Sequence, residues 1–137
     1  MSYQAISGEK PLFISFVVRT NYNPVPYKRT TQRQKFKDKE YAKYRRYKEL
    51  IVAEFARETG KLPHQVLRKG VKYSVDVVAF YKDKTHGDTD NVAKGVNDAI
   101  FSSPLSDKFV CGSYDYRYDV DDPRLHILIQ EVWCERF

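Results

Sequence analysis

The sequence has few of the residues that support redox or zinc chemistry. It contains 2 cysteines and 3 histidines among 137 residues. Cys111 and Cys134 form no Cys-x-x-Cys pair, and the histidines are scattered, so no set of zinc ligands can be recognised. We expect two buried thiols in a reducing compartment, and a disulfide between them stays open as the alternative.

Long hydrophobic runs are also missing. No apolar stretch approaches the roughly 18 residues that a membrane-spanning helix needs. The first residues, Met1 to Ser7, lack a basic flank followed by an apolar core, so they predict no secretory signal. We therefore expect a cytoplasmic protein without a membrane partner.

The composition is that of a folded, basic protein. Hydrophobic residues make up 42% and charged residues 31%, and the length fits a single domain over residues 1–137. The 24 lysines and arginines outnumber the 18 acids, which gives a formal net charge of +6. Such an excess favours polyanionic partners, chiefly nucleic acid, although many basic proteins use it only for solubility.

The pattern of hydrophobic residues predicts an α+β fold. Segments typical of strands are residues 11–20, 71–82, 110–120 and 124–133. One helix should begin at the cap Asp38 and end at Gly60, and a second should follow Asp90. We expect a small mixed sheet of about four strands against two main helices, with 71–82 central, 110–120 half-exposed and 124–133 its hairpin partner.

Positive charge is concentrated in one segment. Ten of the cations fall within 21 residues: Lys28, Arg29, Arg33, Lys35, Lys37, Lys39, Lys43, Arg45, Arg46 and Lys48. A nucleic-acid-binding patch requires such a concentration, but an ordinary solvated helix face would also produce it.

Acidic residues are crowded in residues 88–98, directly after the predicted central strand. Asp88 and Asp90 repel each other unless a cation lies between them or one is protonated. The helical pattern that follows places Asn91, Lys94 and Asp98 on one face. Because hard cations prefer oxygen ligands, the stretch predicts a Mg²⁺ site.

Three other interpretations of the Asp-x-Asp pattern are possible. An EF-hand loop is excluded, because Val92, Ala93 and Ala99 stand where it needs an oxygen ligand, glycine and glutamate. An aspartyl-phosphate phosphatase would have its motif directly after the strand, whereas residues 84–87 intervene here. The third alternative is a capped helix with a surface pair between Asp90 and Lys94, which would contribute about 0.3–0.5 kcal/mol.

The order Asp-x-Asp-Asn-x-x-Lys-x-x-x-Asp, then a loop acid and a strand, resembles the signature of the RusA family of Holliday-junction resolvases. The residues that carry the resemblance are Asp88, Asp90, Asn91, Lys94, Asp98, Asp107 and 114–117. It covers residues 73–132, and the N-terminal half agrees only in layout. The chain departs from the family at Ser106, where an acid is usual, and at Asn97, where an apolar residue is usual.

The resemblance implies a small, dimeric, Mg²⁺-dependent endonuclease of bacteria or their phages, with no organic cofactor and with Mn²⁺ as a substitute metal. It implies that the metal ligands are Asp88, Asp90 and Asp107, that Lys94 is the essential lysine, and that Asn91 and Asp98 support the site. We expect the DNA contacts to come from Lys28, Arg29, Arg33, Lys35, Lys37 and Lys94.

The function that follows is resolution of Holliday junctions by paired phosphodiester hydrolysis, in DNA recombination and repair. Two alternatives stay open at this point. One is a non-catalytic basic nucleic-acid-binding module whose acids merely cap a helix, and the other is a nuclease for flaps or other branched DNA.

Overall fold

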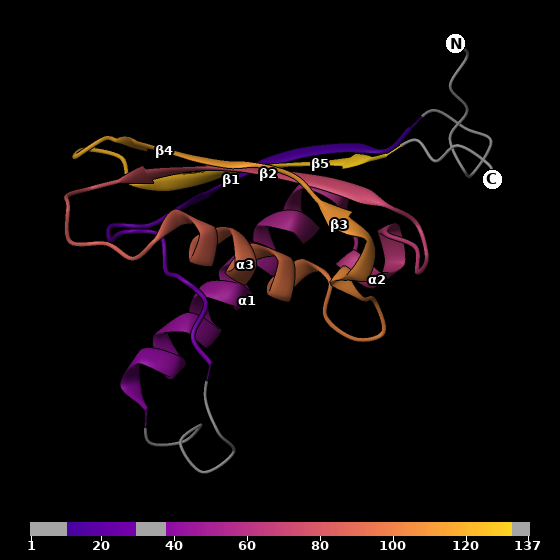
Figure 1. The fold of residues 1–137 in the computed structure, drawn as a ribbon, viewed down its shortest axis with the longest axis horizontal. Helices are drawn as coiled ribbons and strands as arrows, with labels where there is room; N and C mark the ends of the chain where they lie inside the picture. Colours follow the sequence, from indigo (N-terminus) through magenta and orange to yellow (C-terminus); the bar gives the residue numbers. More distant parts are fainter. Residues whose placement is uncertain (1–10, 30–37, 133–137) are drawn as a thin grey trace.

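The computed structural model describes residues 11–29 and 38–132, which form an α+β fold (Figure 1). Its elements are β1 (Phe13–Arg19), α1 (Lys39–Thr59), α2 (Pro63–Val66), β2 (Tyr73–Tyr81), α3 (Thr89–Ile100), the 3₁₀ turn η1 (Asp107–Phe109), β3 (Val110–Cys111), β4 (Tyr114–Tyr118) and β5 (Arg124–Glu131). The fold class that we predicted from the sequence is confirmed.

The mixed sheet has β1 at one edge and the two short strands β3 and β4 at the other. Its order is β1-β5-β2-β3, and β4 also pairs with β2. The pairs β1–β5 and β5–β2 are antiparallel, whereas β3 and β4 run parallel to β2. The predicted central position of β2 is confirmed.

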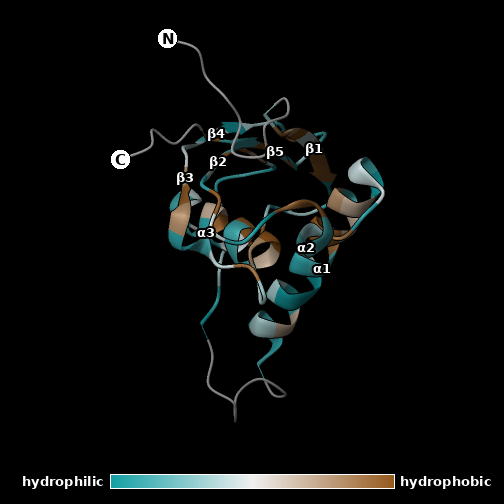
Figure 2. Ribbon diagram, turned by 90° about the vertical axis from the view of Figure 1, so that its right-hand side faces the viewer, coloured by the Kyte–Doolittle hydropathy of each residue, from teal (hydrophilic) through white to brown (hydrophobic). Residues whose placement is uncertain are grey.

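The helices lie on one face of the sheet and cover the hydrophobic core (Figure 1). Every second residue of β2 and β5 is buried, and Tyr44, Tyr47, Ile51 and Phe55 of α1 pack against them at helical spacing. Figure 2 shows hydrophobic residues along β1 and a mainly hydrophilic α1, because most of that helix faces solvent. None of the described helices is long and apolar enough to span a membrane.

The predicted ends of α1 are confirmed. The Asp38 carboxylate accepts hydrogen bonds from the backbone N–H groups of Glu40 and Tyr41, at 2.9 and 3.3 Å. At the other end Gly60 adopts a left-handed conformation with φ of 77° and closes the helix.

Two predictions about the last strands are wrong. β5 does not form a hairpin with β4, because β2 lies between them and β5 pairs with β1 and β2 instead. The side chains Leu125, Ile127 and Ile129 explain this position, since they are at most 1% exposed and need cover on both sides. In β4 all five residues are exposed, rather than every second one, because the strand lies at the edge of the sheet.

The prediction of two buried thiols is wrong for Cys111 and untested for Cys134, which lies outside the described residues. Cys111 is a free, exposed thiol. It lies at the end of the two-residue strand β3, which forms an edge of the sheet within the described part of the chain.

Gly112 allows β3 and β4 to stay close to β2. It has φ of +144°, and a Cβ atom there would lie 1.9 Å from the backbone oxygen of Val75. Beside it, the Asp76 carboxylate accepts hydrogen bonds from the N–H and hydroxyl of Ser113, at 3.0 and 2.8 Å. These side-chain bonds continue the pairing with β2 across the break between β3 and β4.

We expect Gly112→Ala to lower the free energy of unfolding by about 2–4 kcal/mol, because the clash with Val75 and the unfavourable φ act together. Gly70→Ala is the matched control, since Gly70 has φ of +83° but no atom within 4 Å of the added Cβ. It should cost only about 1–2 kcal/mol. Urea denaturation measures both, and an equal loss in the two variants would contradict the close approach.

Candidate functional site

The predicted metal ligands Asp88 and Asp90 lie at the start of α3. The backbone oxygen of Asp88 accepts hydrogen bonds from Asn91 and Val92, but its side chain makes no capping bond. Asp90 is exposed in the first turn. The capping interpretation therefore does not explain the carboxylate of Asp88.

Three of the predicted catalytic residues line one open hollow of about 280 Å³. Asp90 and Lys94 come from α3, and Asp107 comes from η1 after the following loop. Residues of β3 and β4, among them Cys111 and Tyr114, form the opposite wall. Asp88 is not among the lining residues, so the structure brings together Asp90, Lys94 and Asp107 but does not place Asp88 with them.

The oxygen donors of this hollow suit a hydrated Mg²⁺ ion. Asp90 and Asp107 supply carboxylates. Asn97 also lines the hollow, and its buried Oδ1 atom accepts no hydrogen bond from the described residues. Mg²⁺ keeps several waters and is commonly held by one or two carboxylates. Among the described residues, however, no three His, Cys, Asp or Glu side chains lie close enough together to hold a metal ion.

Lys94 is oriented by an aromatic ring. Its Nζ lies 4.3 Å from the centroid of the Tyr27 ring, and it forms no ion pair with Asp90 within the described part of the chain. A hydrogen bond of 2.9 Å from the N–H of Tyr27 to the backbone oxygen of Asn91 fixes the ring beside α3. Cation–π contacts of this kind contribute about 0.5–1 kcal/mol at exposed sites, enough to favour one orientation of the ammonium group.

Gly95 allows Tyr27 and Tyr44 to lie close to α3. A Cβ atom at this position would lie 3.2 Å from the Tyr44 ring and 3.4 Å from the backbone nitrogen of Tyr27. The absence of a side chain therefore lets the Tyr27 segment and α1 both pack on α3 directly beside Lys94.

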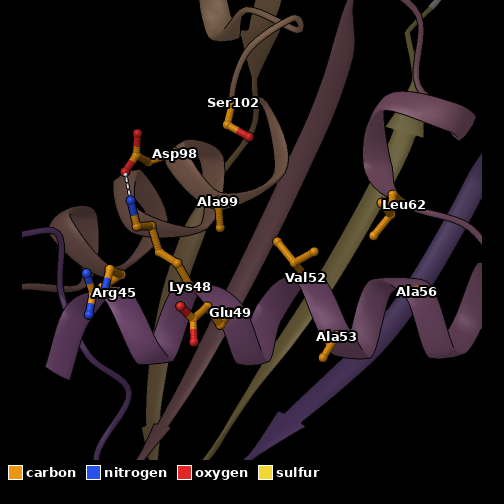
Figure 3. A pocket seen from close by; sticks show the side chains of 10 residues that line it. All are labelled: Arg45, Lys48, Glu49, Val52, Ala53, Ala56, Leu62, Asp98, Ala99 and Ser102. Atoms are coloured by element: carbon orange, nitrogen blue, oxygen red, sulfur yellow. Dashed lines mark hydrogen bonds and ion pairs between the residues drawn. The ribbon is translucent and has the colours of Figure 1, made fainter. Parts of the chain in front are cut away.

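Asp98 lies outside the hollow and links α3 to α1. Its Oδ2 accepts hydrogen bonds from the Tyr44 hydroxyl at 2.5 Å and from Lys48 Nζ at 2.9 Å, and Figure 3 shows the second of these. Burial raises the pKa of Asp98, but these two hydrogen bonds and the charges of Lys48 and Lys94 outweigh it, so the net pKa is lowered. Burial and the bond to Asp98 raise the pKa of Tyr44 far above its usual range.

The predicted DNA-binding residues are only partly described. Lys28 and Arg29 are exposed and line a hollow of about 350 Å³ with Tyr27, Tyr41 and Lys48. Arg33, Lys35 and Lys37 lie outside the described residues. The solvent-facing cations of α1 are Lys39, Lys43, Arg45 and Arg46 in its first half and Arg57 in its last turn. Lys48 differs from them, because its ion pair with Asp98 reduces its availability for a phosphate.

A further hollow, of about 400 Å³, lies between α1, α2 and the end of α3 (Figure 3). Its lining includes Val52, Ala56, Leu62 and Ala99, and only Asp98 comes from the acidic stretch. Glu49 also lines it, but the carboxylate of Asp98 is already paired with Lys48 Nζ at 2.9 Å, so this hollow does not offer two unpaired carboxylates to a metal ion.

Two residues of the site carry no signal in the sequence. Tyr27 follows a proline-rich turn and precedes two cations, and nothing there indicates a contact with Lys94. Tyr114 belongs to an alternating strand, and only the parallel pairing of β4 with β2 places it at the hollow. Asn97 did carry a signal in the sequence, because an apolar residue is usual at this position in the family.

The variant Asp98→Asn tests the link between the helices. We expect it to lower the free energy of unfolding by about 1 kcal/mol at pH 7, since the side chain is 42% exposed and solvent screens the interaction. A carboxylate whose pKa is lowered on folding stabilises the protein above its unfolded pKa of about 3.9 and loses that contribution as pH falls through the folded value. The difference from the unmodified protein should therefore shrink toward pH 3.

Urea denaturation at pH 7 and at pH 3 measures this difference. Asp121→Asn is the control, since Asp121 is an exposed turn residue. A loss at Asp98 that is equally large at both pH values would contradict the role of the charge.

Comparison with known proteins identifies a family for the chain. A search of curated proteins found no match to the chain. The family model described as endodeoxyribonuclease RusA matches residues 21–130, which include every element from α1 to β4 and all the residues of the hollow. The chain belongs to the RusA endodeoxyribonuclease family.

Proposed function

We propose that the protein is a metal-dependent endonuclease that resolves four-way DNA junctions. The observation that carries the proposal is the hollow shared by Asp90, Lys94 and Asp107, in a chain of the RusA family. Two acids and a cation at one exposed place suit hydrolysis of a phosphodiester, which is itself an anion and requires charge neutralisation.

In the proposed site Asp90 and Asp107 hold Mg²⁺, with Mn²⁺ as a substitute, and Asp88 at the start of α3 completes the set on binding. When bound, the metal lowers the pKa of a water molecule and polarises the phosphate. The ammonium group of Lys94 neutralises the scissile phosphate or orients the attacking water. Its contact with Tyr27 fixes where that charge lies before DNA arrives.

The cations that follow Tyr27 hold the DNA backbone. Lys28 and Arg29 follow Tyr27 directly, so they lie next to the ring that orients Lys94. Contacts to phosphates supply affinity without reading sequence. Because a junction has two-fold symmetry and needs two cuts, we propose that two copies of the chain act together as a dimer.

One observation favours a second candidate, a non-catalytic module that binds nucleic acid. The described residues contain no preformed cluster of three metal-binding side chains, as a rigid metalloenzyme would have. A third candidate, a nuclease for flaps, uses the same site. Cleavage assays with junction, flap and duplex DNA, each with Mg²⁺ and with EDTA, separate the three.

Asp90→Asn should abolish cleavage of a labelled four-way junction in Mg²⁺, because one metal ligand is lost. Binding of the uncut junction should stay intact or become tighter, since a negative charge that faces DNA is removed. Gel-shift and cleavage assays on the same preparation measure the two properties.

Asp121→Asn is the matched control, because it removes the same charge from an exposed turn outside the hollow. It should cut normally. Normal cleavage by Asp90→Asn would show that the assignment is wrong, and a junction that is bound but uncut by the unmodified protein would favour the non-catalytic module.

Lys28→Gln and Arg29→Gln should each weaken junction binding and reduce the slope of log K against log salt concentration by about 1. The reason is that each phosphate contact releases counterions from DNA. Lys61→Gln is the control, since Lys61 is an exposed residue beyond the C-terminal end of α1. An unchanged slope in both variants would show that Lys28 and Arg29 are solvated surface charges that do not contact DNA phosphates.

A further inference from the structure

Three tyrosines form a stripe along β4 on the face of the sheet that carries the helices. Tyr114, Tyr116 and Tyr118 stand in register with Val77, Ala79 and Tyr81 of β2. Those three β2 residues are at most 1% exposed, whereas the three β4 tyrosines are 50–56% exposed. The edge strand therefore presents aromatic rings to solvent at positions where its neighbour is covered.

The rings of the stripe do not cover one another. Tyr116 and Tyr118 meet edge to face, with centroids 5.8 Å apart and an angle of 80° between the ring planes. Neither ring is stacked on the Tyr81 ring, which lies 6.3 and 6.1 Å away at 48°. An edge-to-face pair leaves ring faces free to stack on another flat group.

The far end of the stripe is held by His86. The His86 ring stacks on Tyr81 with centroids 3.6 Å apart and an angle of 4°, and its Nε2 lies 2.9 Å from the hydroxyl of Tyr118. His86 Nδ1 lies 2.7 Å from the backbone oxygen of Gly87. These contacts reduce the conformational freedom that Tyr118 would lose on binding a ligand.

The near end of the stripe, at Tyr114, borders the hollow that Asp90, Lys94 and Asp107 line. Cations stand at both ends, because Lys94 shares the hollow and the exposed Lys82 directly follows Tyr81, the register partner of Tyr118. On the other face of β4 the carboxylate of Asp115 is paired with Arg117 at 2.8 Å. A strand of DNA can thus run from the hollow along the rings.

We propose that Tyr114, Tyr116 and Tyr118 form a stacking platform for unpaired nucleobases that flank the scissile phosphate. Bases within a duplex already stack on their neighbours, whereas bases freed at a branch point expose their faces. Aromatic side chains bind such bases with little regard to sequence. The inference rests on the proposed function in one respect, which is that a DNA strand lies in the hollow. It adds that the protein recognises unpaired bases of that DNA.

The test is a double-mutant cycle between tyrosine rings and DNA bases. The probes are a fluorescently labelled 12-nucleotide oligo(dT) and an oligonucleotide of equal length made of abasic sites. Fluorescence anisotropy in EDTA gives the affinity of each without cleavage. The variants are Tyr116→Leu, which removes the aromatic faces, and Tyr116→Phe, which keeps them, with Tyr114→Leu as a second site in case the first variant does not fold.

The matched control is Phe13→Leu, because Phe13 is an exposed aromatic residue on β1, at the opposite edge of the sheet. We expect Tyr116→Leu to weaken oligo(dT) binding about tenfold and to leave binding of the abasic strand within about twofold. Tyr116→Phe and Phe13→Leu should bind oligo(dT) like the unmodified protein.

Equal losses for the two oligonucleotides, or no loss for oligo(dT), would overturn the proposal. A change in the sedimentation coefficient of Tyr116→Leu without DNA would also overturn it, since the stripe would then be covered by a second copy of the chain. If the tyrosine variants behave as expected but no junction is cut, the platform stands and the proposed nuclease function falls. If the unmodified protein cuts junctions but the tyrosine variants bind oligo(dT) as it does, the nuclease function stands and the platform falls.

Discussion

The close packing of α3 on its neighbours is the constraint on which the site depends. Gly95 lets the backbone of Tyr27 and the ring of Tyr44 touch the helix, and Asp98 joins the same helix to α1 through Tyr44 and Lys48. Because these contacts fix the helix along its length, Asp90 and Lys94 are carried to one wall of the hollow. The loop after α3 then returns Asp107 to that wall.

Charge is divided between two faces of α3. Asp90 and Lys94 lie toward the hollow, where both are exposed. Asp98 faces α1, and its charge stabilises the contact between the two helices through Tyr44 and Lys48. Tyr27 connects the two functions, since its backbone is bonded to α3 and its ring holds the ammonium group of Lys94. In this arrangement Asp98 stabilises the packing of the helices, whereas Asp90 of the same short stretch remains exposed in the hollow.

Sequence reasoning succeeded where a pattern is local. The cap Asp38, the terminator Gly60, the buried stripe of α1 and the start of α3 follow from spacing alone and are confirmed. It failed where the outcome depends on pairing between distant strands. The insertion of β2 between β4 and β5, and with it the exposure of the β4 tyrosines, is decided by the burial that β5 requires on both sides. The contact of Tyr27 with Lys94 is likewise a tertiary event with no local signature.

The central claim is that Asp90 and Asp107 hold the metal ion of a nuclease. A crystal structure of the protein grown with Mn²⁺, with anomalous scattering recorded at the manganese edge, tests it directly. The account predicts one or more manganese peaks in the hollow, coordinated by Asp90 and Asp107, and their disappearance in Asp90→Asn. Manganese bound only at other surface carboxylates, or an unchanged peak in Asp90→Asn, would contradict it.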